Sequence, residues 1–250
     1  MMAPGIRAYG VAAIALGVVG LVWGDFATTW QPVPEDLPNR MALAYAAAFL
    51  LIASGGLLQL QRAPRTIALI PAGLYAAFAV LWAIRVAGYP AIFGTWLGLA
   101  EQLALVIGGG AVVALRSGGA RLALACRLGF GACLVVFGVA HWIYVKETAA
   151  MVPGWLPPSG EGWAIATGAF HALAGLALLS GVRALLAARL VVAMFVGFGL
   201  LVWLPQLAPW PGTHLAWGGN AINLALVGAA WAVADMIRAI RPGAAASAGR

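Results

Sequence analysis

The chain has 250 residues, of which 64% are apolar and only 8% are charged, and its formal net charge is +7. Soluble globular domains carry about 25% charged residues, so this composition excludes an ordinary water-soluble fold. The mean hydropathy of +0.97 points to lipid as the solvent for most of the chain. Its apolar stretches have the length of a helix that crosses a bilayer, and they lack the two-residue alternation of a membrane barrel.

Eight membrane-spanning helices are predicted from these stretches. They cover residues 6–28, 41–61, 66–87, 94–115, 122–145, 162–182, 186–205 and 214–237. The first stretch follows Arg7, as the apolar region of a signal peptide follows a basic residue, but no small-residue cleavage site clearly follows it. We therefore expect an all-α, polytopic transmembrane bundle that keeps its first helix.

The positive charges predict the orientation of this bundle. With a cytoplasmic N-terminus, eleven of the 14 Lys and Arg residues fall on the cytoplasmic side, and only Arg40, Arg85 and Lys146 fall on the other. Cytoplasmic loops carry an excess of Lys and Arg, so both termini are expected in the cytoplasm. The net charge then serves orientation and attraction to anionic membrane lipid, and no nucleic-acid partner is expected.

The chain also repeats itself at an offset of 121 residues. The matching pairs are Gly10/Gly131, Gly17/Gly138, Pro32/Pro153, Phe49/Phe170, Arg62/Arg183, Trp82/Trp203, Pro90/Pro211 and Trp96/Trp217. Four helices in each copy would make both copies insert in the same sense, as parallel repeats do. We expect two parallel four-helix repeats, a first unit at residues 1–115 and a second unit at 122–240. The Gly-rich stretch 116–121 would be a flexible cytoplasmic linker, and 241–250 a flexible tail.

The second unit has polar residues where the first has apolar ones. In chain order, His141 pairs with Gly20, His171 with Leu50, His214 with Phe93 and Asn220 with Leu99. Ionisable residues inside membrane spans usually carry function, so we expect a polar pocket in the outer half of the second unit, covered by the loop around Trp155. The candidate catalytic residues are His141 and His171, and the candidate substrate-binding residues are Tyr144, Trp155, Thr167, Trp217, Asn220 and Asn223.

Structural roles are open alternatives for several of these residues. Asn220 and Asn223 would each cross-link helices through a hydrogen bond worth roughly 0.6 kcal/mol, and His214 is expected to cap an interface. For His141 and His171, a site role and a structural role are weighed equally. Neither a metal nor a haem is expected, because the sequence has no histidine-containing ligand motif.

The remaining charges inside or near the spans have simpler expected roles. Arg85 and Glu101 occur in the first unit alone and are predicted to form a structural ion pair between the third and fourth spans. The alternative for Glu101 is a carboxyl group that handles protons. Asp235 is expected to pair with Arg238, three residues further along its helix, and Asp25 is expected to be solvated at the interface.

Three segments of the second unit resemble DoxX-like membrane proteins. They are Phe137-Gly-Val-Ala-His141, Val152-Pro-Gly-Trp-Leu-Pro157 and Thr167-Gly168. The resemblance covers about residues 122–237, and the first unit looks like a degenerate copy that lacks the histidine and the Trp-Leu-Pro. It implies a bacterial inner-membrane protein linked to quinone-dependent redox or oxidative-stress systems, since relatives include the DoxD subunit of thiosulfate:quinone oxidoreductase.

On this basis we expect a membrane subunit of a quinone-linked redox system, in which His141 and His171 contact a quinone and exchange protons with it. The sequence has no glycine-rich dinucleotide motif, so electrons would pass to or from a soluble or membrane-bound redox partner. Whether the chain is itself an enzyme stays open, and no cofactor other than a quinone is indicated. The alternatives are a transporter or binding protein for small molecules or lipids, and a membrane scaffold for partner enzymes.

Overall fold

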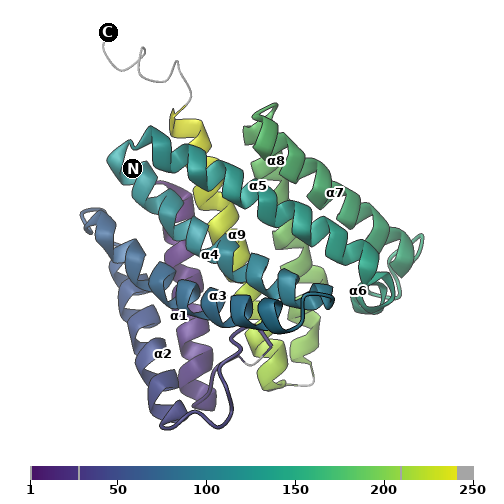
Figure 1. Ribbon diagram of the computed structural model, residues 1–250, viewed down its shortest axis with the longest axis horizontal. Helices are drawn as coiled ribbons and strands as arrows, with labels where there is room; N and C mark the ends of the chain where they lie inside the picture. Colours follow the sequence, from purple (N-terminus) through teal and green to yellow (C-terminus); the bar gives the residue numbers. More distant parts are fainter. Residues whose placement is uncertain (1, 28, 209, 241–250) are drawn as a thin grey trace.

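The computed structural model describes residues 2–27, 29–208 and 210–240, and all regular structure in these ranges is helical (Figure 1). Eight helices are long and apolar enough to cross a membrane, which confirms the predicted number of spans and indicates a multi-pass membrane protein. They are α1 (Pro4–Trp23), α2 (Arg40–Leu57), α3 (Leu69–Gly88, after a 3₁₀ turn at Arg65–Ala68), α4 (Phe93–Ser117), α5 (Ala120–Ile143), α7 (Gly160–Ser180), α8 (Ala184–Phe198, extended by other helical turns to Leu207) and α9 (His214–Ile240).

A ninth, short helix was not predicted. Helix α6 (Val145–Met151) begins just after α5 ends, and it packs against α7. None of its residues is buried. With seven residues it is too short to show a membrane span or a clear helical periodicity in the sequence, and the stretch therefore reads as a loop.

The two predicted units are interleaved in space. Helix α1 packs along α9, and α4 packs along α5, so each unit's first helix lies against the other unit's last helix. The α1–α9 contact is close: a Cβ atom on Gly228 would lie 2.7 Å from the Cα of Tyr9, and one on Gly5 would lie 2.7 Å from the Cα of Ala232. Small residues allow this approach of the two backbones.

The linker between the two units is shorter in the structure than the sequence predicted. Helix α4 continues through Ser117 and α5 begins at Ala120, so only Gly118 and Gly119 of the stretch 116–121 lie between helices. Gly118 has φ +66°, the left-handed conformation that ends α4 and that glycine adopts without steric cost. The connection is therefore a tight turn between packed helices. The predicted tail at 241–250 lies outside the described residues.

Two helix pairs, α1–α2 and α5–α7, are packed in the same way. A Cβ atom on Gly10 would lie 2.8 Å from the carbonyl oxygen of Gly55, and one on Gly131 would lie 2.9 Å from that of Gly175. These partner positions are 120 residues apart, one fewer than the sequence offset. His171 consequently takes the place of Leu51, which is 2% exposed, and not that of Leu50, which is 42% exposed. The contacts thus correct the predicted pairing by one residue.

Arginine and aspartate side chains join helix ends at the end of the bundle where α1 begins. Asp235 of α9 accepts a hydrogen bond from the backbone N–H of Gly5 at 2.9 Å and forms the predicted salt bridge with Arg238 at 3.0 Å. Arg127 of α5 donates to the carbonyl oxygen of Leu178 in the last turn of α7 at 2.7 Å. The contacts with Gly5 and Leu178 satisfy backbone groups that a helix terminus leaves without an internal partner.

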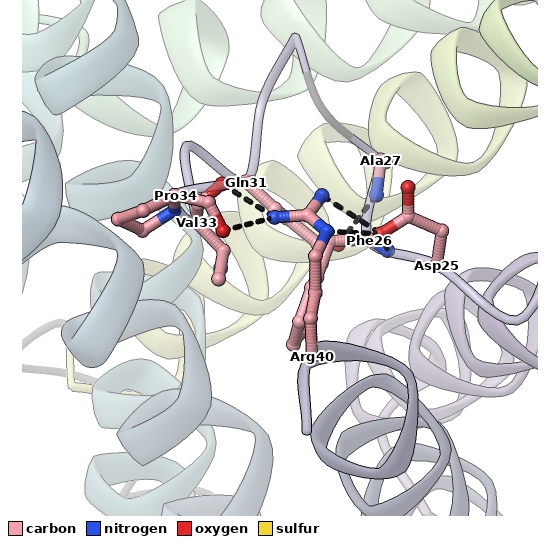
Figure 2. A network of polar contacts seen from close by, with 7 residues as sticks. All are labelled: Asp25, Phe26, Ala27, Gln31, Val33, Pro34 and Arg40. Atoms are coloured by element: carbon pink, nitrogen blue, oxygen red, sulfur yellow. Dashed lines mark hydrogen bonds and ion pairs between the residues drawn. The ribbon is translucent and has the colours of Figure 1, made fainter. Parts of the chain in front are cut away.

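At the opposite end, the loop between α1 and α2 is held by one arginine (Figure 2). Arg40 forms a salt bridge with Asp25 at 2.7 Å and donates to the carbonyl oxygens of Val33 at 2.5 Å and Pro34 at 2.8 Å. The side chain of Asp25 is 37% exposed, in line with its expected place at the interface, but its salt bridge was not predicted. Because three points of the loop meet at one guanidinium group, the loop has a fixed shape, and its Trp30 is buried.

Candidate functional site

A cavity of about 470 Å³ lies among α4, α5, α7, α8 and α9, with α6 and its following loop on one side. Five of the predicted site residues line it, and these are His141, Tyr144, Thr167, His171 and Asn223. Most of the remaining lining is apolar, with aromatic rings from Trp30, Phe137, Phe195, Phe198 and Trp203. The volume falls within the range of about 300–1,000 Å³ typical of small-molecule sites. These five residues therefore lie around one cavity.

The two histidines lie next to each other in the cavity wall. Their ring centroids are 4.8 Å apart, and their planes are tilted by 44°. His141 comes from α5 and His171 from α7, so the packing of these two helices brings the rings together. His171 is 1% exposed and lies edge-on to Phe137, with Phe195 5.7 Å away. The pair is thus set in an aromatic, largely apolar wall.

Hydrogen bonding fixes the tautomer of both neutral rings. Nδ1 of His141 lies 2.8 Å from the carbonyl oxygen of Phe137, and Nδ1 of His171 lies 2.9 Å from that of Thr167. A carbonyl oxygen can only accept, so each Nδ1 carries the hydrogen and donates it. The lone pair of each imidazole is then on Nε2. Both histidines therefore offer Nε2 as an acceptor to a ligand.

Glu101, from the first unit, also lines the cavity. The predicted ion pair with Arg85 is not formed: the salt bridges among the described residues are Asp25–Arg40 and Asp235–Arg238. Arg85 is exposed near the end of α3, and its guanidinium group lies 5.2 Å from the centroid of the Trp82 ring. Glu101 thus lines the cavity whereas Arg85 is exposed, a difference that the sequence spacing does not reveal.

Three predicted substrate-binding residues lie outside the cavity lining. Trp155 is 72% exposed, and the adjacent Leu156 lines the cavity in its place. Trp217 donates its indole N–H to the carbonyl oxygen of Pro211 at 2.6 Å. Asn220 donates to the carbonyl oxygen of Trp203 at 2.7 Å, so it ties α9 to the segment after α8, which is the structural role weighed for it. The loop around Trp155 therefore borders the cavity, but Trp155 itself points elsewhere and does not line it.

The other polar lining residues are partly committed to the backbone. Asn223 donates one amide hydrogen to the carbonyl oxygen of Phe195 at 3.0 Å, and Thr167 donates its hydroxyl hydrogen to that of Trp163 at 2.7 Å. The hydroxyl oxygen of Tyr144 accepts from the backbone N–H of Gly94 at 2.8 Å. These bonds hold the three side chains in place around the histidine pair.

His214 has a different environment from the other two histidines. Its ring stacks on Trp23 of α1, with centroids 5.0 Å apart and an interplanar angle of 9°. It is not among the residues that line the cavity. This stacking joins α9 to α1.

An irregular helical segment forms another wall of the cavity. Helix α8 ends at Phe198, and residues Gly199–Trp203 form a π-helical turn that is followed by a 3₁₀ turn at Leu204–Leu207. A regular helix was predicted through residue 205. Pro205 has no N–H to donate to the preceding turn, which accounts for the loss of regular α-helical bonding. Such π turns occur frequently at functional sites, and here the turn carries Val202 and Trp203 into the lining.

Among the described residues, no three His, Cys, Asp or Glu side chains lie close enough together to bind a metal ion. No protein-family model, curated protein or solved structure matches the chain.

Proposed function

We propose that this protein binds a quinone or quinol in the cavity, as the membrane subunit of a quinone-linked redox system. The observation that carries the proposal is the histidine pair, with both Nε2 atoms available in an aromatic wall inside the membrane-spanning region. Quinone rings are flat and apolar with polar oxygens at two ends, so aromatic stacking and a few directed hydrogen bonds suit them. The DoxX-like segments around His141 and Thr167 point in the same direction.

The proposed chemistry assigns protons to this chain and electrons to a partner. Oxidation of a quinol to a quinone breaks two O–H bonds and releases two protons and two electrons. His141 and His171 would each accept a hydroxyl hydrogen through Nε2, because an imidazole exchanges protons near neutral pH. The electrons would pass to a redox partner protein. Quinone reduction uses the same groups in the opposite direction.

The first test is to identify what the protein carries from the membrane. The full chain is purified in mild detergent, and its lipid extract is examined by mass spectrometry and its absorption spectrum recorded. A quinone present in stoichiometric amount supports the proposal. A different small molecule in that amount would favour the binding-protein or transporter alternative, and stable protein partners with no small molecule would favour the scaffold.

The second test replaces each cavity histidine with phenylalanine, which removes the Nε2 acceptor and keeps an aromatic ring. His141→Phe and His171→Phe should each weaken binding of a short-chain quinol by about tenfold, the effect of losing one hydrogen bond of about 1.4 kcal/mol. His214→Phe is the matched control, since His214 stacks on Trp23 outside the cavity lining. Equal binding by all three variants and the wild type would contradict the proposal.

One observation favours the transporter alternative. The break in α8 at Gly199–Trp203 lines the cavity, and discontinuous helices form the substrate sites of many transporters. Its counterpart α3 is a continuous helix, however, whereas transporter repeats usually carry such breaks in both copies. Uptake of a labelled quinol analogue into sealed proteoliposomes, with no redox partner present, would support transport over redox function.

We also propose that the two units are parallel copies in a bacterial inner membrane, with both termini in the cytoplasm. Equivalent contacts support this. Trp96 donates its indole N–H to the carbonyl oxygen of Pro90 at 3.1 Å, and Trp217 donates to that of Pro211 at 2.6 Å. The arginine bias supports the orientation.

A further inference from the structure

We propose that the cavity opens sideways into the membrane between α7 and α8, and that its ligand is an amphiphile whose apolar chain lies in this opening. The opening, called the window below, is formed by Trp163 and Thr167 of α7 and by Gly197 and Leu201 of α8. Under the proposed function, on which this rests, the ring lies at the histidine pair and its chain leaves the protein between the two helices.

Gly197 leaves a gap in the cavity wall. It is half-buried and lines the cavity, yet a Cβ atom added to it would have no neighbour within 4 Å. The other glycine of the lining, Gly219, is packed so closely that its Cβ would overlap the Trp203 ring. Protein interiors contain few spaces that are larger than a water molecule. The wall is therefore open at Gly197.

The gap is on the side of α8 that faces away from α9. Gly199 is two residues further along and so lies on nearly the opposite side of the helix. It packs against α9, because a Cβ atom on Gly199 would lie 2.8 Å from Nδ2 of Asn223. The long helices that pack against α8 are α9 and α7, and Figure 1 shows α7 and α8 diverging from the turn that joins them. Gly197 thus borders the space between α8 and α7.

Exposure increases from the back of the cavity to the window. On α7, Trp163, Thr167 and His171 are four residues apart, so they form one stripe along the helix that lines the cavity. His171 is buried, Thr167 is half-buried and Trp163 is exposed. On α8 and its extension, Phe195 is buried and Leu201 is exposed in the same way. The cavity therefore opens toward Trp163 and Leu201.

The window lies at the depth of lipid hydrocarbon. Thr167 is seven residues after the start of its span and Gly197 is ten residues before the end of its span, which is about 10 and 15 Å along the helices. Consecutive spans run in opposite directions, so these two ends lie on the same side of the membrane. The hydrocarbon core of a bilayer is about 30 Å thick. A molecule that passes through the window therefore comes from the lipid phase.

The chemistry of the window suits an apolar chain. The hydroxyl hydrogen of Thr167 is donated to the carbonyl oxygen of Trp163 at 2.7 Å, and the indole N–H of Trp163 is donated to that of Pro157 at 2.9 Å. Both donors at the rim are thus occupied, and Gly197 and Leu201 add only apolar atoms. The polar groups of the histidine pair lie deeper, where they suit the head of the ligand.

The test compares two ligands that share a ring and differ in the chain. The full chain in lipid nanodiscs is titrated under anaerobic conditions with a short-chain quinol and with a quinol that carries a long alkyl chain. In Gly197→Leu, the leucine side chain fills the window. We expect this variant to bind the long-chain compound about tenfold or more weakly than the wild type, and to bind the short-chain compound with unchanged affinity.

Gly56→Leu is the matched control. It adds the same side chain to a spanning helix at an exposed position outside the lining, where a Cβ atom likewise meets nothing within 4 Å. It should change binding of neither compound. Equal binding of the long-chain compound by Gly197→Leu and the wild type would overturn the window, and so would an equal loss for both compounds.

A second measurement needs no ligand. Cys126 and Cys133 are replaced by alanine, and a nitroxide label is attached to Gly197→Cys or, as a reference on the lipid-facing surface, to Gly56→Cys. In vesicles, molecular oxygen concentrates in lipid, whereas a nickel chelate stays in water. We expect oxygen to relax the nitroxide at position 197 more strongly than the chelate does. Stronger relaxation by the chelate would show that the cavity opens to water, and would overturn the window.

The two measurements separate the window from the proposed function. If neither quinol binds to the wild type, the proposed function fails, and the nitroxide at position 197 still decides whether the cavity opens to lipid. If both quinols bind but the nitroxide is relaxed by the chelate, quinone binding stands and the window is overturned.

Discussion

His141 and His171 lie ring to ring at 4.8 Å, and each donates its Nδ1 hydrogen to the carbonyl oxygen four residues before it in its own helix. This arrangement orients both rings from within their helices and leaves both Nε2 atoms for the cavity. A purely structural role for buried histidines would be to join neighbouring helices, and these hydrogen bonds do not. The pair therefore does not have the helix-joining role that buried histidines often have.

Replacement of His171 by leucine separates structure from function. Leu51 occupies the equivalent buried position on α2, so leucine fits the packing at this site. We expect His171→Leu to change Tm by no more than about 4 °C, equivalent to about 1 kcal/mol, while ligand binding is lost. Thermal unfolding in detergent, followed by tryptophan fluorescence, measures the first quantity. A large loss of stability would mean that His171 holds the helices together.

The position of the Trp203 ring in the cavity wall should depend on the absence of a side chain at Gly219. A Cβ atom on Gly219 would overlap the Trp203 ring, so Gly219→Ala must displace this ring from the cavity. We expect a loss of about 1–3 kcal/mol of stability from overpacking, together with weaker ligand binding. Gly73→Ala is the control, because nothing lies within 4 Å of its added Cβ and alanine favours a helix. Equal stability of both variants would show that Trp203 has room to move.

The loop that carries Trp30 should loosen without Arg40. A lysine at this position keeps the charge, but its single ammonium group does not match the fork that joins Asp25 to the carbonyl oxygens of Val33 and Pro34. Arg40→Lys should therefore raise amide hydrogen exchange across residues 29–39 with only a small change in global stability. Arg62→Lys, at an exposed site, should leave exchange in this loop unchanged. Identical amide hydrogen exchange in both variants would show that Arg40 does not determine the shape of the loop.

The orientation can be read by chemical labelling in intact cells. Cys126 and Cys133 are free but buried, so they are replaced by alanine, and single cysteines are then introduced at exposed positions in Glu35→Cys and Gln61→Cys. An impermeant maleimide added outside the cytoplasmic membrane should label the first variant, and the second only after lysis. The reverse pattern would place the arginine-rich end outside, against the positive-inside rule.

The spans were predictable because their signal is local. An apolar stretch of sufficient length marks a membrane helix whatever it packs against, and all eight were found within a few residues of their observed ends. The break after Phe198 was missed, although Pro205 carried a signal for it. Helix α6 was missed because seven residues between two spans show no comparable pattern.

The cavity was predictable only in part. His141, His171 and Asn223 were found by comparing the two units. The two histidines have no polar counterpart in the first unit, whereas Asn223 keeps a polar group within a span. Glu101 was assigned to the wrong partner, since its neighbours are set by the packing of α4 against the second unit. Trp155 was predicted to bind substrate because its motif is distinctive, but the orientation of one side chain in a loop is not encoded in composition, and Leu156 lines the cavity instead.

Contact of the ligand with the Nε2 atoms of His141 and His171 can be observed by nitrogen-15 NMR. The chain has three histidines, so His214 is an internal control in the same sample. With labelled histidine, addition of a short-chain quinol should shift the Nε2 signals of His141 and His171 and leave that of His214 in place. Saturable binding that leaves the signals of His141 and His171 unmoved would contradict a contact between the ligand and the histidine pair.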